Sequence, residues 1–354
     1  MPMKASGWRS RHRVLLGSAT LAVTAALIAV GVPALALSTH PASTASPTSG
    51  SGYPPPGGIY TGFTNCPVKN PLMHESNSIT VCVFGDATSG TIKLGSITTQ
   101  VTEPVNVQFG FYQNTQQPYY ADVVPPPEGL SAQLATKPDL IPDSLTTALG
   151  CATATNSTVK SICQTAQAKG GIYNQVYALA ESDGAITDFN LFTWTQPVMF
   201  RLINPLLGND CTIGTFGHPV TLNPQLSVAP GGGLTQTNDP NPVKHPDTAV
   251  IGITKASASD STFAAPGVSN CGPGGVADLP VQAALDAGSG LPAASGNSLT
   301  LTGTFQLADT YAAQSTPGTD NAAILLSALK YSRKNVHAQQ ITQSQMDQLL
   351  NYNG

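Results

Sequence analysis

The stretch ITVCVFGDATSGTIKLGSITTQVTEPVNVQFGF, residues 79–111, decides the fold. Runs of β-branched and aromatic residues alternate in it with Gly, Pro, Asp and Ser, which favour turns. These runs predict strands at 79–84, 91–94, 97–101 and 105–111. Because each strand follows the last after a short turn, the stretch predicts an antiparallel meander.

A small helical insert is predicted at about 140–170. The spacing of apolar residues changes here from two to about 3.6, the period of an α-helix. A short helix at 144–149 is followed by Gly150, and a second helix at 158–169 is followed by Gly170. Glycine just after the last turn is a common helix end, so the pattern indicates two consecutive short helices.

Strand patterns return after the insert, at 172–179, 186–191, 198–203, 220–222, 249–253 and 299–307. A hairpin turn at Gly184 is predicted between the first two of these strands. Two long loops, 229–247 and 264–278, are rich in Gly, Pro and Asn. A half-polar sheet must bury its apolar face, so we expect the β stretches before and after the insert to form two sheets packed face to face. The predicted fold class is mainly β, an antiparallel β-sandwich-like domain over 59–312.

A helical C-terminal tail is predicted at 313–354. Residues 320–334 carry apolar side chains at helical spacing, with an acid at the start and basic residues at the close, which suits the helix dipole. Thr342 and Gln345 form a capping box that begins a second short helix. These helices either dock on the sheet or stand free as a partner-binding tail.

Residues 1–36 predict a secretory signal peptide. Basic residues precede an uncharged stretch at 14–32, and the run ALA at 34–36 has the small residues that a signal peptidase reads. The alternative is an uncleaved membrane anchor, because this stretch could nearly span a bilayer. Residues 37–58 are rich in Ser, Thr, Pro and Gly and predict a linker.

The composition excludes two classes of protein. Charged residues make up 10% of the chain, against about 25% in a typical soluble domain, and the formal net charge is −4. Because 41% of the residues are apolar, the chain can bury a large core, which excludes disorder for its bulk. Basic residues are few and scattered, so nucleic-acid binding is excluded to first order.

Six cysteines lie beyond the predicted signal, at Cys66, Cys82, Cys151, Cys163, Cys211 and Cys271. An even number of cysteines in an exported chain predicts disulfides. We predict the pairs 66–82, 151–163 and 211–271, because each pair then lies within one local unit and the second ties the helical insert together. Zinc is the alternative, but no two cysteines stand two to four residues apart, as paired zinc ligands do.

Catalytic motifs are mostly absent, and the sequence predicts no cofactor, no metal site and no catalytic residue. It contains neither a nucleophile elbow, nor a phosphate-binding loop, nor a dinucleotide fingerprint, and His74 lacks a second His at zinc spacing. A Ser, His and Asp triad assembled through space stays open, with His218, His245 and Asp247 as candidates. Histidines in Pro-rich loops are more often turn residues.

The densest acidic cluster is Glu181, Asp183 and Asp188, around Gly184. Two facing carboxylates can hydrolyse a glycosidic bond, and carboxylates also bind calcium, although the full calcium-loop pattern is missing. The simpler interpretation is turn chemistry at a hairpin tip.

Aromatic side chains that could stack on a sugar are few. The predicted mature chain has one tryptophan, Trp194, and aromatic pairs at 111–112 and 119–120. Strand aromatics are mostly core residues. Asn156 begins a glycosylation acceptor pattern, which matters only where the machinery that glycosylates it exists.

Several short motifs follow one another in the second half of the chain. They are NPLLG at 204–208, PVTL at 219–222 and LPAASGN at 291–297, with Cys211, Ile213-Gly214, Cys271-Gly272 and Gly275 between them. In this order they resemble segments of a group of secreted, uncharacterised proteins from actinobacteria, loosely from 61 to 309. The resemblance implies secretion and a disulfide-linked β fold, and it assigns no activity and no site. The alternative is that these Gly, Pro and Cys residues shape turns around a disulfide.

These observations favour a secreted, non-enzymatic structural or binding protein of the cell envelope or extracellular space, with an unknown envelope or extracellular partner. The alternatives are a secreted hydrolase acting on wall or external polymers, and a carrier of lipids or small ligands with the helical insert as a lid. Long loops on a rigid sheet often carry binding residues, so 229–247 and 264–278 are the expected recognition surface.

We predict that processing removes residues 1–36 and that the mature chain begins at Leu37, because the small residues at 34–36 follow the apolar stretch at cleavage distance. The intact mass of protein purified from the culture medium measures this. Recovery only from the membrane fraction, with residues 1–36 attached, would contradict it.

Overall fold

The computed structural model describes residues 58–309 except 69, 75–77, 115–120, 127–133, 136, 190–191 and 239–248. After two short 3-10 helices, the described chain forms a long β-hairpin. Its first strand, β1 (Ser78–Leu94), has 17 residues, and the chain turns at 95–96. It returns as β2 (Ile97–Val101) and β3 (Val105–Asn114), which both pair with β1. The meander prediction is therefore wrong in detail, because 79–84 and 91–94 belong to one strand and β3 does not pair with β2.

A β-bulge lies where the sequence shows turn signals between those two predicted strands. The pairing of β1 with β13 (Ser298–Asp309) shifts between Ala87 and Ser89. A side chain at Gly303 would collide with the backbone of Asp86, so the close approach of the strands at this point requires glycine. The turn-forming residues therefore bend β1 locally and do not end it.

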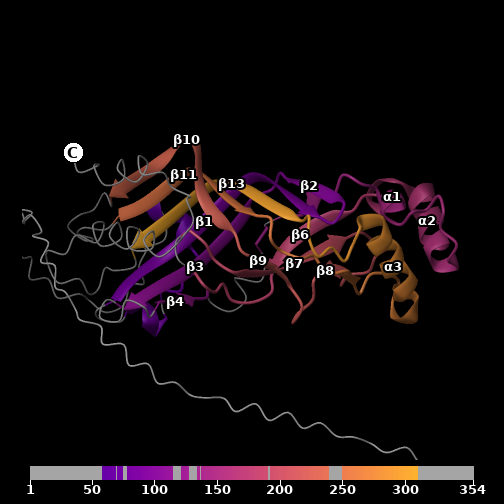
Figure 1. Ribbon diagram of the computed structural model, residues 1–354, viewed down its shortest axis with the longest axis horizontal. Helices are drawn as coiled ribbons and strands as arrows, with labels where there is room; N and C mark the ends of the chain where they lie inside the picture. Colours follow the sequence, from indigo (N-terminus) through magenta and orange to yellow (C-terminus); the bar gives the residue numbers. More distant parts are fainter. Residues whose placement is uncertain are drawn as a thin grey trace, which may run out of the picture. The chain divides into compact units, whose positions relative to one another are not determined.

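Sheet A contains the strands in the order β10 (Gln225–Asn238), β11 (Ala249–Asp260), β13, β1, β3 and β4 (Ala121–Val124), and β2 also pairs with β1. Figure 1 shows β11, β13, β1 and β3 side by side in this order. The central strand β13 has the sequence SLTLTGTFQLAD, in which large apolar residues alternate with smaller or polar ones. This two-residue period gives β13 one apolar face along its whole length.

Sheet B contains the strands in the order β12 (Val268–Ser269), β8 (Thr212–Ile213), β7 (Gln196–Ile203), β6 (Tyr177–Ser182) and β5 (Asp139–Leu140), and β9 (Val220–Leu222) also pairs with β7. The prediction of two antiparallel sheets is confirmed. Their division along the chain differs from the prediction, because sheet A combines the hairpin before the helical insert with three strands after it.

Two further predictions are corrected. Residues 183–195 connect β6 to β7, so the predicted strand at 186–191 and the hairpin turn at Gly184 are wrong, and one isolated bridge joins Thr187 to Thr195. The predicted loop 229–247 belongs to β10 as far as Asn238, and its remainder lies outside the described residues. The run of Pro and Gly at 230–233 forms a bulge in β10, since the pairing of β10 with β11 shifts between Val228 and Gly233.

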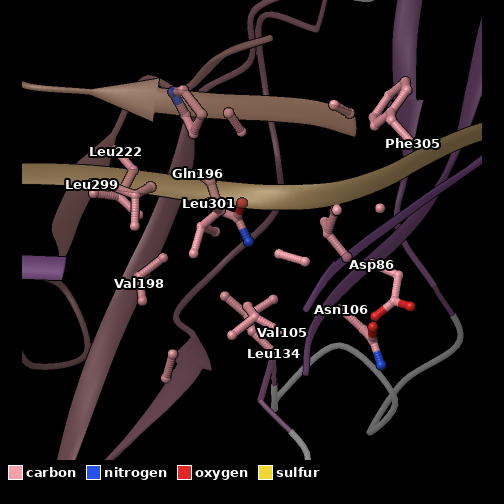
Figure 2. Close-up of a pocket in the computed structure, with 18 of the residues that line it drawn as sticks. Asp86, Val105, Asn106, Leu134, Gln196, Val198, Leu222, Leu299, Leu301 and Phe305 are labelled. Atoms are coloured by element: carbon pink, nitrogen blue, oxygen red, sulfur yellow. The ribbon is translucent and has the colours of Figure 1, made fainter. Parts of the chain in front are cut away.

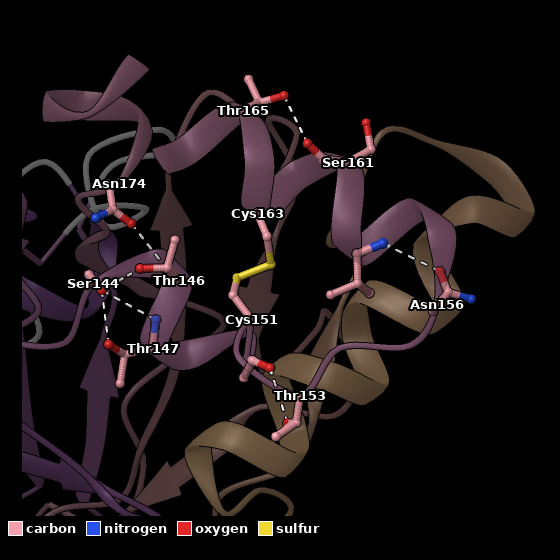
Figure 3. The surroundings of a disulfide bond; sticks show 12 residues. Ser144, Thr146, Thr147, Cys151, Thr153, Asn156, Ser161, Cys163, Thr165 and Asn174 are labelled. Atoms are coloured by element: carbon pink, nitrogen blue, oxygen red, sulfur yellow. Dashed lines mark hydrogen bonds between the residues drawn. A yellow bond between two sulfur atoms is a disulfide. The ribbon is translucent and has the colours of Figure 1, made fainter. Parts of the chain in front are cut away.

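The helical insert is confirmed, with α1 (Leu145–Ala148) capped by Ser144 and α2 (Ser157–Lys169) capped by Asn156. The disulfide Cys151–Cys163 joins the turn after α1 to the middle of α2 (Figure 3). A third helix, α3 (Asp278–Ser289), packs on both. The sequence pattern does not predict α3, because Ala277 makes no side-chain cap and Pro280 and Gly288 are poor helix formers.

Three apolar clusters hold these layers together. The first lies between the two sheets and continues to the three helices. In the second, Phe189, Phe192 and Trp194 from the 183–195 connection cover the same face of sheet A beyond the edge of sheet B. In the third, the 3-10 helices η1 (Gly58–Phe63) and η2 (Pro71–His74) cover its opposite face. One face of sheet A is thus covered along its length, and the opposite face is covered at one end.

The six cysteines form three disulfides, Cys66–Cys82, Cys151–Cys163 and Cys211–Cys271, which is the pairing predicted from neighbouring positions. The predicted signal peptide at 1–36, the linker except its last residue, and the helical tail at 313–354 lie outside the described residues. Among the residues that are described, no helix is long and apolar enough to cross a membrane.

Replacing Cys211 and Cys271 with Ser should destabilise the protein more than the same change at Cys151 and Cys163. The sequence separations are 60 and 12 residues, for which loop entropy predicts losses of about 4 and about 3 kcal/mol. Cys211 and Cys271 are also fully buried. Urea unfolding followed by circular dichroism measures both losses, and a larger loss for the Cys151 and Cys163 variant would contradict the ranking.

Candidate functional site

A cavity of about 80 Å³ lies between sheet A and sheet B (Figure 2). It exists because small residues meet in sheet A. The strand register places Ala87 and Ala256 on either side of Gly303, and Ala258 beside Leu301. These residues leave open space in front of the sheet.

The walls of this cavity are almost entirely apolar. Trp194 and Phe305 form one end, with ring centroids 6.3 Å apart in a stacked arrangement. The remaining large apolar side chains come from both sheets, and they include Ile92, Val105, Val198, Phe200, Leu222, Leu226, Leu299 and Leu301. Such a surface binds hydrocarbon better than water.

A second cavity of about 40 Å³ adjoins the first and shares Ile92, Ala180 and Phe200 with it. Its carboxylate, Asp139, is buried and already satisfied. Oδ1 of Asp139 accepts hydrogen bonds from the backbone N of Thr102 at 2.8 Å, from Oγ1 of Thr102 at 2.8 Å and from the backbone N of Glu103 at 3.1 Å. Asp139 therefore joins the break between β2 and β3 to sheet B and has a structural role.

A wider groove of about 250 Å³ adjoins the first cavity on the side of β3. Pro125 and Pro126 line it directly after β4, and polar side chains such as Asn65, Gln108 and Ser182 line it as well. The groove and the first cavity share Asn106, Val107, Leu134 and Gln196. The three spaces thus form a row whose lining is mixed, polar and apolar, at the groove and mainly apolar within.

The boundary between the groove and the first cavity consists of Asn106, Val107, Leu134 and Gln196. Leu134 connects the sheets, because its carbonyl accepts from the backbone N of Asn106 at 2.7 Å and its own N donates to the carbonyl of Ala180 at 3.1 Å. Gln196 is 5% exposed, and its Oε1 accepts from Nε1 of Trp194 at 3.0 Å. Oδ1 of Asn106 is buried and has no hydrogen-bond partner among the described residues.

Figure 2 shows Gln196 and Leu301 reaching into the middle of the cavity, while Asp86 and Asn106 lie together to one side. Asp86 and Asn106 are cross-strand neighbours in β1 and β3. The described lining of the three spaces includes no Cys, His, Lys or Arg. Its chemistry is therefore that of apolar contact and hydrogen bonding.

The predicted acidic cluster is divided among separate partners. Glu181 accepts from Nε and Nη2 of Arg201 at 3.0 and 2.9 Å, so its charge is neutralised by a two-pronged ion pair. Asp188 accepts from Oγ1 of Thr187 at 3.1 Å. Burial raises the pKa of Asp183, and a hydrogen bond from the backbone of Gly217 lowers it in part. Among the described residues, no group of three acidic, His or Cys side chains could hold a metal ion.

The other sequence candidates also take structural places or lie outside the described residues. His218 is exposed in a turn that pairs it with Thr215, and His245 and Asp247 are not described. Phe111 and Tyr112 are 6% and 1% exposed, so they are core residues and cannot stack on an external sugar. Positions 119–120 and the side chain of residue 74 are outside the described part.

Two buried asparagines explain part of the motifs quoted from the second half of the chain. Asn204 of NPLLG is 4% exposed and donates to the carbonyls of 172, 173 and 175. Asn297 of LPAASGN is 1% exposed, accepts from the N of Gly95 and donates to the carbonyls of Phe263 and Ala293. These side chains hold turns in place, which is a structural role.

The predicted recognition loops contribute little to the row of cavities. No residue of 264–278 lines the three spaces, and the described part of 229–247 is strand β10. Asn156 of the glycosylation pattern caps α2 through hydrogen bonds to the N atoms of Thr158 and Val159. The lining residues carry no local motif, since they come from distant strands, and only the small residues on the apolar face of sheet A distinguish them.

No family model matches the chain, and neither curated proteins nor solved structures show a match. The resemblance to secreted actinobacterial proteins stays an expectation from the sequence.

Replacing Asp183 with Asn should change how stability depends on pH. Because burial raises its pKa in the folded protein, the folded state keeps this proton to higher pH than the unfolded chain does. The wild type should therefore lose stability, relative to D183N, as the pH rises through the ordinary Asp value toward the folded one. Urea unfolding at about pH 3 and about pH 7 measures this difference.

The exposed Asp143 offers a matched control, because D143N makes the same chemical change at the surface. An equal difference between wild type and D183N at both pH values would contradict the expected effect.

Proposed function

We propose that this protein is a secreted, non-enzymatic binding protein of the cell envelope or extracellular space, and that it holds an apolar or amphipathic small molecule between its sheets. The observation that carries the proposal is the apolar cavity, with a groove of mixed polar and apolar lining beside it. Pockets with apolar walls and a few polar groups at one end are typical of small-molecule sites.

The volumes indicate how such a molecule would be placed. A dry apolar cavity of about 150 Å³ binds benzene, so about 80 Å³ accommodates only the narrow end of an apolar molecule. The groove of about 250 Å³ has room for the rest. A single unbranched chain with a polar end fits this shape best, with its apolar end between the sheets.

The disulfides support an oxidising compartment, which agrees with the predicted signal peptide. The expectation that the helical insert acts as a lid lacks support, because neither α1 nor α2 contributes a lining residue to the described spaces. The one described serine of the groove, Ser182, donates to the carbonyl of Gly184, and the triad candidates His245 and Asp247 of the hydrolase alternative lie outside the described residues.

Replacing Ala258 with Leu should reduce the binding of an apolar single-chain dye, such as an unbranched conjugated tetraene, by at least about tenfold, because the added carbons occupy the first cavity. The matched control is Ala287→Leu, which makes the same change at an exposed position of α3. Dye fluorescence measures binding, and circular dichroism checks that both variants fold.

Equal dye binding by A258L and the wild type would contradict a site between the sheets. Absence of dye binding to the wild-type protein would contradict the proposed function itself.

A further inference from the structure

We infer, on the basis of the proposed function, that the site selects an uncharged single-chain amphiphile whose polar end donates a hydrogen bond, such as a long-chain alcohol, and that it rejects the corresponding carboxylate. The inference rests on the charges and hydrogen-bonding groups of the lining, and it names the chemical class of the ligand.

The charges of the lining exclude an anionic ligand. Among the described residues that line the three spaces there is no Lys, Arg or His, so a carboxylate or phosphate would lose its water shell without gaining a cation. The two ionisable groups of the lining are both acidic, Asp86 at the first cavity and Asp139 at the second. Both would repel an anion.

Asp139 is occupied by three hydrogen bonds from the chain, so it offers nothing to a ligand. Asp86 is half-buried and lies beside Asn106 across the pair β1 and β3 (Figure 2). A single half-buried carboxylate compensates poorly for the desolvation of a cation, so an ammonium end is also disfavoured. An uncharged polar end remains.

The boundary of the cavity also needs a hydrogen-bond donor. Oδ1 of Asn106 is a buried acceptor without a partner among the described residues, and Asn106 belongs to the lining of both the groove and the cavity. Leaving such an acceptor unpaired is unfavourable, and a hydroxyl or amide N–H that reaches it would remove this penalty. An ether or ester, which only accepts, would not.

The order of groups along the row sets the orientation of the ligand. Beyond Asn106, Leu134 and Gln196 the lining is almost entirely apolar, whereas the groove side adds the polar groups of Asn65, Gln108 and Ser182 to its apolar lining. An amphiphile therefore enters with its hydrocarbon end first and leaves its polar end at Asn106. Branched or two-chain lipids do not fit a cavity of about 80 Å³.

The test compares decanol, decanoate, decylammonium and decyl methyl ether at neutral pH. In the full chain with Trp8→Phe, Trp194 is the one tryptophan, and because it lines the cavity its fluorescence reports occupancy. Calorimetry provides a second measure of binding. Decanol should bind at least about tenfold more tightly than decanoate and several-fold more tightly than the ether.

Two variants assign the effect to the proposed groups. Asp86→Asn should strengthen decanoate binding and so reduce the ratio of the affinities for decanol and decanoate. Asp122→Asn makes an equal change of charge at an exposed residue outside the lining, and it should leave this ratio unchanged. Asn106→Leu should remove the preference for decanol over the ether. If a variant fails to fold, the comparison of the four compounds on the protein without these two substitutions still tests the ligand class.

Decanoate or decylammonium binding as tightly as decanol would overturn the ligand class while leaving the proposed site intact. Equal binding of the ether and decanol would overturn the role of the donor. If none of the four compounds binds and the apolar dye also fails to bind, the proposed function falls together with this inference.

Discussion

The regular alternation of β13 is the constraint on which the rest of sheet A depends. Its residues Leu299, Leu301, Phe305 and Leu307 all face one side, because nothing interrupts the two-residue period of this central strand. The neighbouring strands β1 and β11 each have one residue more than β13 along the stretch where they pair with it. Each strand accommodates the extra residue in a bulge next to Gly303. In β1 the bulge moves the inward positions from odd numbers, such as Val83, to even ones, so the sheet keeps one apolar face through the irregularity.

The cavity is a consequence of these bulges. Where two strands bend beside Gly303, the inward positions hold Ala87 and Ala256, whose small side chains leave the space in front of the sheet unfilled. Sheet B lies across from them, and Leu134 joins the two sheets through its hydrogen bonds with Asn106 and Ala180. An empty volume of about 80 Å³ costs about 2 kcal/mol of stability at the usual penalty per unit of cavity volume.

The secondary structure was largely predictable, whereas the site was not. Strands such as 299–307, the capped helices and the disulfide pairs follow from local patterns of residues. Bulges cannot be recognised from local patterns, because Gly85-Asp86 and Ser89-Gly90 have the composition of turns. Only the pairing with β13 shows that the strand continues through them. The lining of the cavity could not be predicted, since Asn106, Gln196 and Ala256 come from different strands and become neighbours only through the register of two sheets.

Several departures from ordinary packing coincide at this one place. The empty volume, the buried acceptor of Asn106 and the buried amide of Gln196 all lie on the lining of the first cavity. An unpaired buried acceptor costs about 1–3 kcal/mol, and with the cavity this is a sizeable fraction of the stability of about 5–15 kcal/mol that folded domains have. Elsewhere Asn204, Asn297 and Asp139 are satisfied by the chain, but Oδ2 of Asp183 is a second buried acceptor without a partner among the described residues. The empty volume and the acceptor of Asn106 nevertheless lie together where an apolar space meets a groove of mixed lining, and this coincidence supports the proposed ligand site.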